Sequence, residues 1–312
     1  MNKPLIIILG PTAVGKTDIA IQIAKRIGGE IISADSMQVY KYMNIGTAKP
    51  DKEEMEGIEH YLIDEIEPDE EFNVAIFQKR AIKYIDKILN KNRIPIVAGG
   101  TGLYINSLIY PLDFTDGITN WKYRDQLNEI ANDKGNEYLH NLLKEIDPIS
   151  ASNIHPNNRK RVIRALEIYK ETGKTMSYYK EISKDKKTPF NPLIIGLKMK
   201  RQLLYERINK RVDMMIDGGL VNEVKEILDK GYNKDLISML GLGYKEIIKY
   251  LEGKYTLEEA IYILKRDTRR FAKRQLTWFR RIEDVSWYDI GEYDSKYSLI
   301  EDILKEINEF LL

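Results

Sequence analysis

The chain has 312 residues, which corresponds to about two domains. Its formal net charge of +1 favours no class of partner, and 43% hydrophobic residues provide enough apolar material for a core. Because the chain has no cysteine, disulfides, thiolate zinc sites and cysteine nucleophiles are excluded. His60, His140 and His155 are scattered and lack the spacing of metal ligands.

Near the N-terminus, residues 5–9 form an apolar run that is too short for a signal peptide, and no cleavage site follows it. No stretch approaches the ~20 apolar residues that a membrane span requires. We therefore expect a soluble protein of the cytoplasm. Nothing in the sequence suggests more than a monomer.

The first part of the chain alternates strand-like and helical patterns. Residues 5–9 form a continuous, β-branched run, as in a strand that is buried on both faces of a parallel sheet. Residues 17–27 and 74–89 then carry their apolar side chains on one helical face. The alternation predicts an α/β fold with a P-loop-type parallel sheet flanked by helices. The other strand-like runs are residues 30–34, 61–63, 94–98, 193–197 and 285–288.

The alternation stops between residues 118 and 189, where amphipathic helical patterns occur without a convincing strand. The sheet pattern resumes at Leu193, so we expect an all-helical domain inserted into another domain. Residues 1–117 and 190–312 would form a P-loop catalytic core, and residues 118–189 a helical insertion domain. Residues 256–281 are the longest helical element of the last third.

A phosphate-binding motif follows the first strand directly. Glycines allow backbone N–H groups to close on phosphate oxygens, and the following helix presents its positive end to the anion. The lysine adds a point charge, and the threonine hydroxyl can join a Mg²⁺ shell. The strand before and the helix after the motif favour function over a chance match, but they do not identify the ligand as a nucleotide. The motif, G-x-x-x-x-G-K-[ST], consists of Gly10, Pro11, Thr12, Ala13, Val14, Gly15, Lys16 and Thr17.

The chain departs from nucleotide kinases in the position of its acidic residue. A P-loop kinase usually carries an aspartate at the end of an apolar strand. Here residues 94–98 lead into a glycine-rich turn with a hydroxyl, Thr101, and no carboxylate. The acid, Asp35, follows residues 30–34 instead, and strand neighbours in such sheets would place it with Thr101 beside the P-loop. Two interpretations of Asp35 stay open: it or Ser36 caps a short helix, or Asp35 is a general base.

Several segments together resemble one family, the tRNA dimethylallyltransferases (tRNA isopentenyltransferases). They occur in the family's order and cover nearly the whole chain. The segments are residues 10–17, 35–40 with 46–50, 99–104, 155–167 and 272–280. Some eukaryotic relatives append a zinc finger, which a chain without cysteine cannot form, so the resemblance is to the bacterial type.

The resemblance implies transfer of a dimethylallyl group from dimethylallyl diphosphate to N6 of the adenine just 3′ of the tRNA anticodon. Diphosphate is released, and Mg²⁺ is required. Because no γ-phosphoryl group is transferred, the missing kinase aspartate is explained. The partners would be the anticodon stem-loop of tRNA and dimethylallyl diphosphate.

The resemblance also implies roles for individual residues. Asp35 would accept the N6 proton or orient the amine, and Thr101 would lie beside it. Lys16 and Arg207 would neutralise the leaving group, and residues 10–17 would bind the diphosphate, with Thr17 near Mg²⁺. The residues implied to contact tRNA are Asp35, Ser36, Met37, Gln38, Thr101, Arg124, Lys160, Arg161, Val162, Ile163, Arg164 and Arg274.

The charged residues between positions 265 and 281 are all basic except Asp267. This excess of positive charge favours contact with RNA phosphates over a merely solvated helix face.

Three rival functions stay open. The chain could prenylate a free adenine nucleotide, act as a P-loop nucleotide or metabolite kinase, or bind RNA without catalysis. The basic residues of the insert disfavour the first, and the missing strand-end aspartate disfavours the second.

Overall fold

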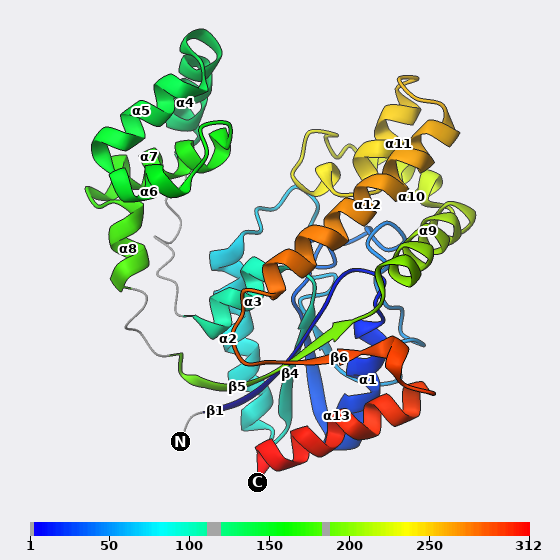
Figure 1. Cartoon of the computed structure of the whole chain (residues 1–312). Helices are drawn as coiled ribbons and strands as arrows, with labels where there is room; N and C mark the ends of the chain where they lie inside the picture. The colour runs from blue at the N-terminus through cyan, green and yellow to red at the C-terminus, as the bar shows by residue number, and fades with distance from the viewer. Residues whose placement is uncertain (1–2, 111–119, 183–187) are drawn as a thin grey trace. The chain divides into compact units, whose positions relative to one another are not determined.

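A computed structural model describes residues 3–110, 120–182 and 188–312 (Figure 1). The chain divides into two compact units: Met1–Ile109 together with Pro189–Leu312, and Tyr110–Thr188. Within the described ranges, no helix has the length and apolar character needed to cross a membrane.

The first unit is built on a six-stranded parallel sheet with the order β3-β2-β4-β1-β5-β6. Strand β1 lies centrally, with Ile7 level with Val97 on one side and with Ile194 on the other. The strands are β1 (Lys3–Leu9), β2 (Gly29–Ser33), β3 (His60–Tyr61), β4 (Ile94–Gly99), β5 (Phe190–Lys198) and β6 (Val285–Asp289). The α/β fold with a flanked parallel sheet is therefore confirmed. Strand β3 is shorter than expected because Leu62 adopts a left-handed backbone (φ 61), which ends the strand.

Helices cover both faces of this sheet, and alternate residues of β1 enter the two cores. Ile6 and Ile8 pack on one face with α1 and α13. Leu5, Ile7 and Leu9 belong to the core on the other face, which includes α2, α3 and parts of α10 to α12. The helices of this unit are α1 (Lys16–Ile27), α2 (Val74–Asn90), α3 (Gly102–Ile109), α9 (Arg201–Asp217), α10 (Leu220–Asp229), α11 (Tyr244–Leu251), α12 (Leu257–Phe279) and α13 (Lys296–Leu311), with short 3₁₀ turns at Ser238–Leu240 and Ile290–Glu292.

The longest helix, α12, begins with a reciprocal cap. Thr256 accepts a hydrogen bond from the Glu259 N–H, and the Glu259 carboxylate accepts one from the Thr256 N–H. Farther along the helix, Leu264, Phe271 and Gln275 line cavities at the end of the sheet. Their spacing of seven and four positions places them on one helix face.

The second unit is helical throughout its described part. Leu127, Leu139, Leu143 and Leu166 belong to a core that four of its five helices share. Asp147 caps α6 by accepting the Ser150 N–H. The helices are α4 (Trp121–Lys134), α5 (Asn136–Ile146), α6 (Pro148–Asn153), α7 (Arg159–Thr172) and α8 (Met176–Ile182).

Candidate functional site

Three turns meet at the carboxyl ends of neighbouring strands. The P-loop follows β1, Asp35 follows β2, and residues 100–101 follow β4. Because the sheet order is β2-β4-β1, these turns lie side by side, at the edge where parallel α/β sheets bind ligands.

The P-loop adopts a conformation that requires special backbone angles. Gly15 has φ 104, a backbone angle that residues other than glycine rarely adopt. Ala13 also lies in the left-handed region, with φ 63. Lys16 begins α1 and donates from Nζ to the Pro11 carbonyl at 2.9 Å. The lysine is thereby folded back over the loop, while Thr17 is exposed at the start of the helix.

One N–H group of the motif donates to a side chain from α12. The Thr12 N–H donates to Oε1 of Gln275 at 2.9 Å, and Gln275 is buried with 7% of its surface exposed. This N–H group therefore has a protein acceptor and is not directed at the cavity. The hydroxyl side chain of Thr12 lines the cavity that borders the P-loop.

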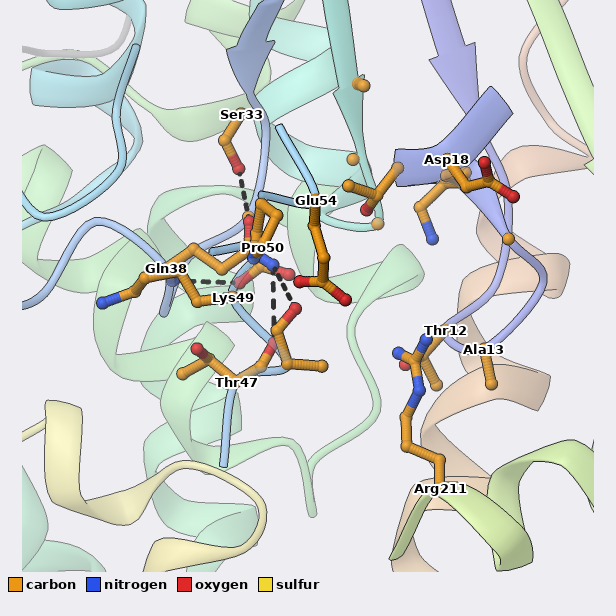
Figure 2. A pocket seen from close by; sticks show the side chains of 18 of the residues that line it. Thr12, Ala13, Asp18, Ser33, Gln38, Thr47, Lys49, Pro50, Glu54 and Arg211 are labelled. Carbon is orange, nitrogen blue, oxygen red and sulfur yellow. Dashed lines mark hydrogen bonds between the residues drawn. The ribbon is translucent and has the colours of Figure 1, made fainter. Parts of the chain in front are cut away.

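The P-loop borders a cavity of about 740 Å³ (Figure 2). A second cavity of about 270 Å³ shares Thr12, Asp35, Arg211 and Phe271 with it. The larger cavity adds the P-loop cation Lys16 and the carboxylates of Asp18 and Glu54. The smaller one adds apolar side chains, among them Met37, Leu240, Leu242 and Leu264, and five polar ones: Ser36, Thr101, Lys245, Thr268 and Arg274.

A cation that the sequence analysis missed, Arg211, lies in this cavity. Figure 2 shows Arg211 extending from α9 toward Thr12 and Ala13. It is half-buried, and no residue in the described parts of the chain makes an ion pair or hydrogen bond with it. Burial and the nearby Arg207 guanidinium lower the pKa of Arg211 below its usual range. A half-buried guanidinium without a partner among the described residues is suited to an anionic ligand.

Arg207 has a different position from the one expected of a group that neutralises a leaving anion. It is exposed and donates from Nη1 to the Val14 carbonyl at 3.3 Å, and it does not line either cavity. Arg211 follows it by four positions, so both lie on one helix face. That spacing was the available sequence signal for Arg211.

The electrostatics of Lys16 reflect its surroundings. Burial and the positive charge of Arg211 lower the pKa of Lys16 to about 7, although Asp35 acts in the opposite direction. Lys16 and Arg211 therefore lie close enough to repel each other, and Asp35 is the carboxylate that favours the charged form of Lys16. An anion bound between the two cations would relieve this repulsion.

Asp35 and Thr101 lie together, and both make local hydrogen bonds. Oδ1 of Asp35 accepts the N–H groups of Met37 at 2.8 Å and Gln38 at 3.4 Å. Thr101 Oγ1 accepts the Ser36 N–H at 3.2 Å. The turn-capping interpretation of Asp35 is therefore satisfied by one oxygen, and Oδ2 receives no hydrogen bond from the described residues. Both interpretations of Asp35 are compatible with this arrangement.

Gln38 is held by its neighbours in the larger cavity. Its Oε1 accepts the Ser33 hydroxyl at 2.9 Å, and its Nε2 donates to the carbonyls of Thr47 and Ala48 at 3.4 and 3.3 Å (Figure 2). The amide therefore fixes residues 47–48 against the end of β2.

The segment 44–49, which forms one wall of the larger cavity, is tied down at both ends. Glu223 on α10 accepts the N–H groups of Asn44, Ile45 and Gly46 at 2.9, 2.7 and 3.0 Å, and the Tyr244 hydroxyl at 2.7 Å. At the other end, the Lys49 side chain, which is 3% exposed, donates to Tyr40 O, Asn44 Oδ1 and Asp64 Oδ1.

The described residues include no group of three or more His, Asp or Glu side chains arranged to hold a metal. Mg²⁺ commonly takes only one or two protein oxygens and fills its octahedron with waters and substrate phosphates. Thr17, Asp35 and Glu54 supply oxygens on the lining of the cavity that contains the P-loop. This donor set fits a Mg²⁺ ion that binds together with a diphosphate.

The basic residues expected to contact tRNA in the helical unit fall into two groups. Lys160 and Arg161 are exposed on α7. Arg124 and Arg164 instead pair with Glu167, which is fully buried, and Arg124 does so through two hydrogen bonds of 2.8 and 2.9 Å. Although burial alone raises the pKa of Glu167, hydrogen bonds from Arg124 and Arg164 hold it below its usual range.

Val162 and Ile163 belong to the core of the helical unit, with 0% and 4% exposure. Their side chains therefore do not form part of its surface. On α12, by contrast, Arg274 is exposed and lines the smaller cavity, while Lys265, Arg266 and Arg270 make ion pairs with acidic neighbours.

Comparison with known proteins gives consistent results. Residues 38–282 match the family model described as IPP transferase. A tRNA dimethylallyltransferase of Acetivibrio thermocellus is 60% identical over 299 residues, which cover 96% of each chain.

Two solved structures are also similar. One is the tRNA isopentenylpyrophosphate transferase of Bacillus halodurans, at 47% identity and a TM-score of 0.74, covering 98% of this chain and 96% of the other. The other is a eukaryotic dimethylallyltransferase acting on tRNA, at 31% identity and a TM-score of 0.85, covering 99% of this chain and 79% of the other.

Proposed function

The chain belongs to the IPP transferase family, and we propose that it transfers a dimethylallyl group from dimethylallyl diphosphate to N6 of the adenine just 3′ of the tRNA anticodon. One observation carries the proposal. A cavity with a P-loop, Lys16 and an unpaired arginine adjoins a smaller one with Thr101, and Asp35 lines both. An anionic leaving group and a neutral amine can thus be held next to each other.

In the transfer, a bond forms from N6 to the allylic carbon while the bond from that carbon to the diphosphate oxygen breaks. The N6 proton passes to the carboxylate of Asp35, with Oδ2 as the oxygen that has no protein donor. Because an exocyclic amine is a weak nucleophile, it must be positioned and relieved of its proton. Thr101 lies beside Asp35 and contacts the adenine.

The leaving diphosphate accumulates negative charge as the bond breaks. We assign its stabilisation to Lys16, to Arg211 and to those P-loop N–H groups that have no protein acceptor. Arg207 supports the loop through the Val14 carbonyl. Mg²⁺ would be held by Thr17 with Glu54, which line the same cavity, and it would supply a further positive charge to the diphosphate.

We further propose that residues 118–189 form a helical domain that contacts tRNA through Lys160 and Arg161. Arg274, Ser36 and Met37 line the smaller cavity and would contact the tRNA at the target base. A base in a single-stranded loop is the least costly to unstack, which agrees with a target beside the anticodon. We propose a monomeric enzyme of the cytoplasm.

The kinase alternative is disfavoured because β4 ends in Gly99 and leads to Thr101, without an aspartate at the end of that strand. Prenylation of a free adenine nucleotide needs no basic helical domain, and the exposed Lys160 and Arg161 disfavour it.

Transfer of radiolabel from dimethylallyl diphosphate, in the presence of Mg²⁺, tests the proposal. Unmodified tRNA, AMP and ATP would be supplied as parallel acceptors. We expect label in tRNA alone, at an adenine beside the anticodon. Label in AMP or ATP would identify a small-molecule enzyme, and the absence of label from all three would return the kinase alternative to first place.

A further inference from the structure

Within the proposed function, on which this inference rests, we propose that Gln275 is a positioning residue that sets the diphosphate site relative to the base site. It has this role because its side-chain amide joins the P-loop to the turn after β4. Although its side chain borders the larger cavity, both polar ends of its amide are engaged by the protein and it would act through the backbone that it holds.

Both ends of the Gln275 amide are engaged. Oε1 accepts the Thr12 N–H at 2.9 Å, and Nε2 donates to the Gly100 carbonyl at 2.8 Å. The orientation of the amide is fixed by its partners, since an N–H requires an oxygen opposite it and a carbonyl requires an N–H. With 7% of its surface exposed, Gln275 is shielded from competing water.

The turn that Gln275 holds is connected directly to the proposed base site. The Thr101 N–H donates to the Ala34 carbonyl at 3.1 Å, and Thr101 Oγ1 accepts the Ser36 N–H. Hydrogen bonds therefore connect Thr12, Gln275, residues 100–101 and the backbone on either side of Asp35. A shift of the P-loop against this turn would change the distance between the leaving group and the base.

Helix α12 packs closely against glycines 100 and 102. A Cβ atom at Gly100 would lie 2.3 Å from Nε2 of Gln275, and one at Gly102 would lie 2.4 Å from the Trp278 ring. Helix α12 thus contacts the turn through Gln275 and the start of α3 through Trp278. Gln275 also removes the Thr12 N–H from the donors that a diphosphate could reach, so the anion is directed to the other donors of the loop.

The experiment compares the full chain with Gln275→Met and Gln275→Glu. Methionine has a similar length but no hydrogen-bonding amide, while glutamate keeps an acceptor for Thr12 and loses the donor to Gly100. Gln202→Met is the matched control, because Gln202 is exposed and its amide contacts only Glu206. The readouts are kcat, KM for each substrate, the melting temperature, the Kd of pyrophosphate and hydrogen exchange of the Thr12 amide in ¹⁵N-threonine-labelled protein.

For Gln275→Met we expect kcat to fall about 10- to 100-fold, because misplacement of about 1 Å has effects of this size. KM for tRNA should stay within about twofold, and the Thr12 amide should exchange at least about tenfold faster. Gln275→Glu should retain slow exchange at Thr12 and still lose kcat. Gln202→Met should match the wild type in every readout.

Unchanged exchange at Thr12 in Gln275→Met would overturn the inference, as would a kcat close to that of the wild type. If kcat falls and both KM values rise by similar factors, and the melting temperature also falls, Gln275 has only a folding role. If the wild type transfers no prenyl group, the proposed function fails by itself. The Thr12 exchange rate and the pyrophosphate Kd then decide whether Gln275 sets the phosphate site, with an unchanged Kd in Gln275→Met counting against it.

Discussion

Asp35 accepts the backbone N–H of Met37 through Oδ1 at 2.8 Å, so one of its two carboxylate oxygens stabilises the turn after β2. The other oxygen has no donor among the described residues. The side chain can therefore cap a turn and accept a proton at the same time, and the two tasks can be separated by mutation.

Asp35→Asn should separate these tasks. Its side-chain oxygen can still accept the Met37 N–H, but the amide cannot take a proton, so we expect kcat to fall about 10²- to 10⁴-fold. Affinity for tRNA should change little, as measured by filter binding. Asp35→Ala should lose both tasks and also loosen the turn. If Asp35→Asn keeps wild-type turnover while Asp35→Ala does not, the residue is only a cap.

Arg211→Met should weaken binding of pyrophosphate by about tenfold or more, because a charge-assisted contact is lost. Arg207→Met is the comparison, since Arg207 is exposed and bonds only a loop carbonyl in the described part of the chain. Titration calorimetry would measure both variants. A greater loss in Arg207→Met than in Arg211→Met would contradict the assignment of Arg211 as the anion contact.

Binding of the diphosphate should take up a proton at Lys16. The pKa of Lys16 is lowered from 10.5 to about 7, so its amino group is largely neutral at pH 8 to 9 in the protein without ligand. A bound anion favours the charged form of this amino group. Calorimetry in buffers of different ionisation enthalpy should show uptake at pH 8.5 that Lys16→Met lacks, and little difference between the two proteins at pH 6. Equal uptake by both proteins at pH 8.5 would contradict the prediction.

The same shift affects stability. Between pH 7 and 10.5 the unfolded chain binds more protons at Lys16 than the folded chain. The contribution of Lys16 to stability therefore becomes more favourable as pH rises through this window. Lys16→Met should remove that part of the pH dependence in urea unfolding curves, and an unchanged dependence would show that Lys16 has an ordinary pKa.

Two arginines of the helical unit should respond differently to substitution. Arg161→Ala removes an exposed charge, so we expect weaker tRNA binding with a salt slope reduced by about 0.7–0.9 and no change in melting. Arg124→Ala leaves the buried Glu167 with fewer partners, so the unit should lose on the order of 1–3 kcal/mol of stability. An unchanged salt slope for Arg161→Ala would remove this surface from the tRNA interface.

The sheet and the P-loop could be predicted from sequence because their signals are local. The run in β1 and the glycine spacing at residues 10–17 each indicate one structure without reference to the rest of the chain. Strand β3 was expected to extend to residue 63, but it ends at Tyr61, because the left-handed backbone of Leu62 cannot be inferred from an apolar triplet.

The charged residues were harder to predict because their roles depend on tertiary contacts. Arg211 has no local signal that distinguishes it from Arg207, yet one faces the cavity and the other is exposed. Glu167 lies in a helix rich in basic residues, and only its complete burial shows that Arg124 and Arg164 have structural partners. A basic helix face therefore gave too many candidates for RNA contact.

The hydrogen bonds from residues 44–46 to Glu223 have a consequence for substrate affinity. Three successive backbone donors on a loop would ordinarily gain order only when an external anion arrives, and ordering a loop reduces the affinity that is observed. Here the protein supplies the anion from α10. This wall of the cavity is thus preorganised before any ligand binds. Ligand binding therefore does not have to offset the conformational entropy of ordering this loop.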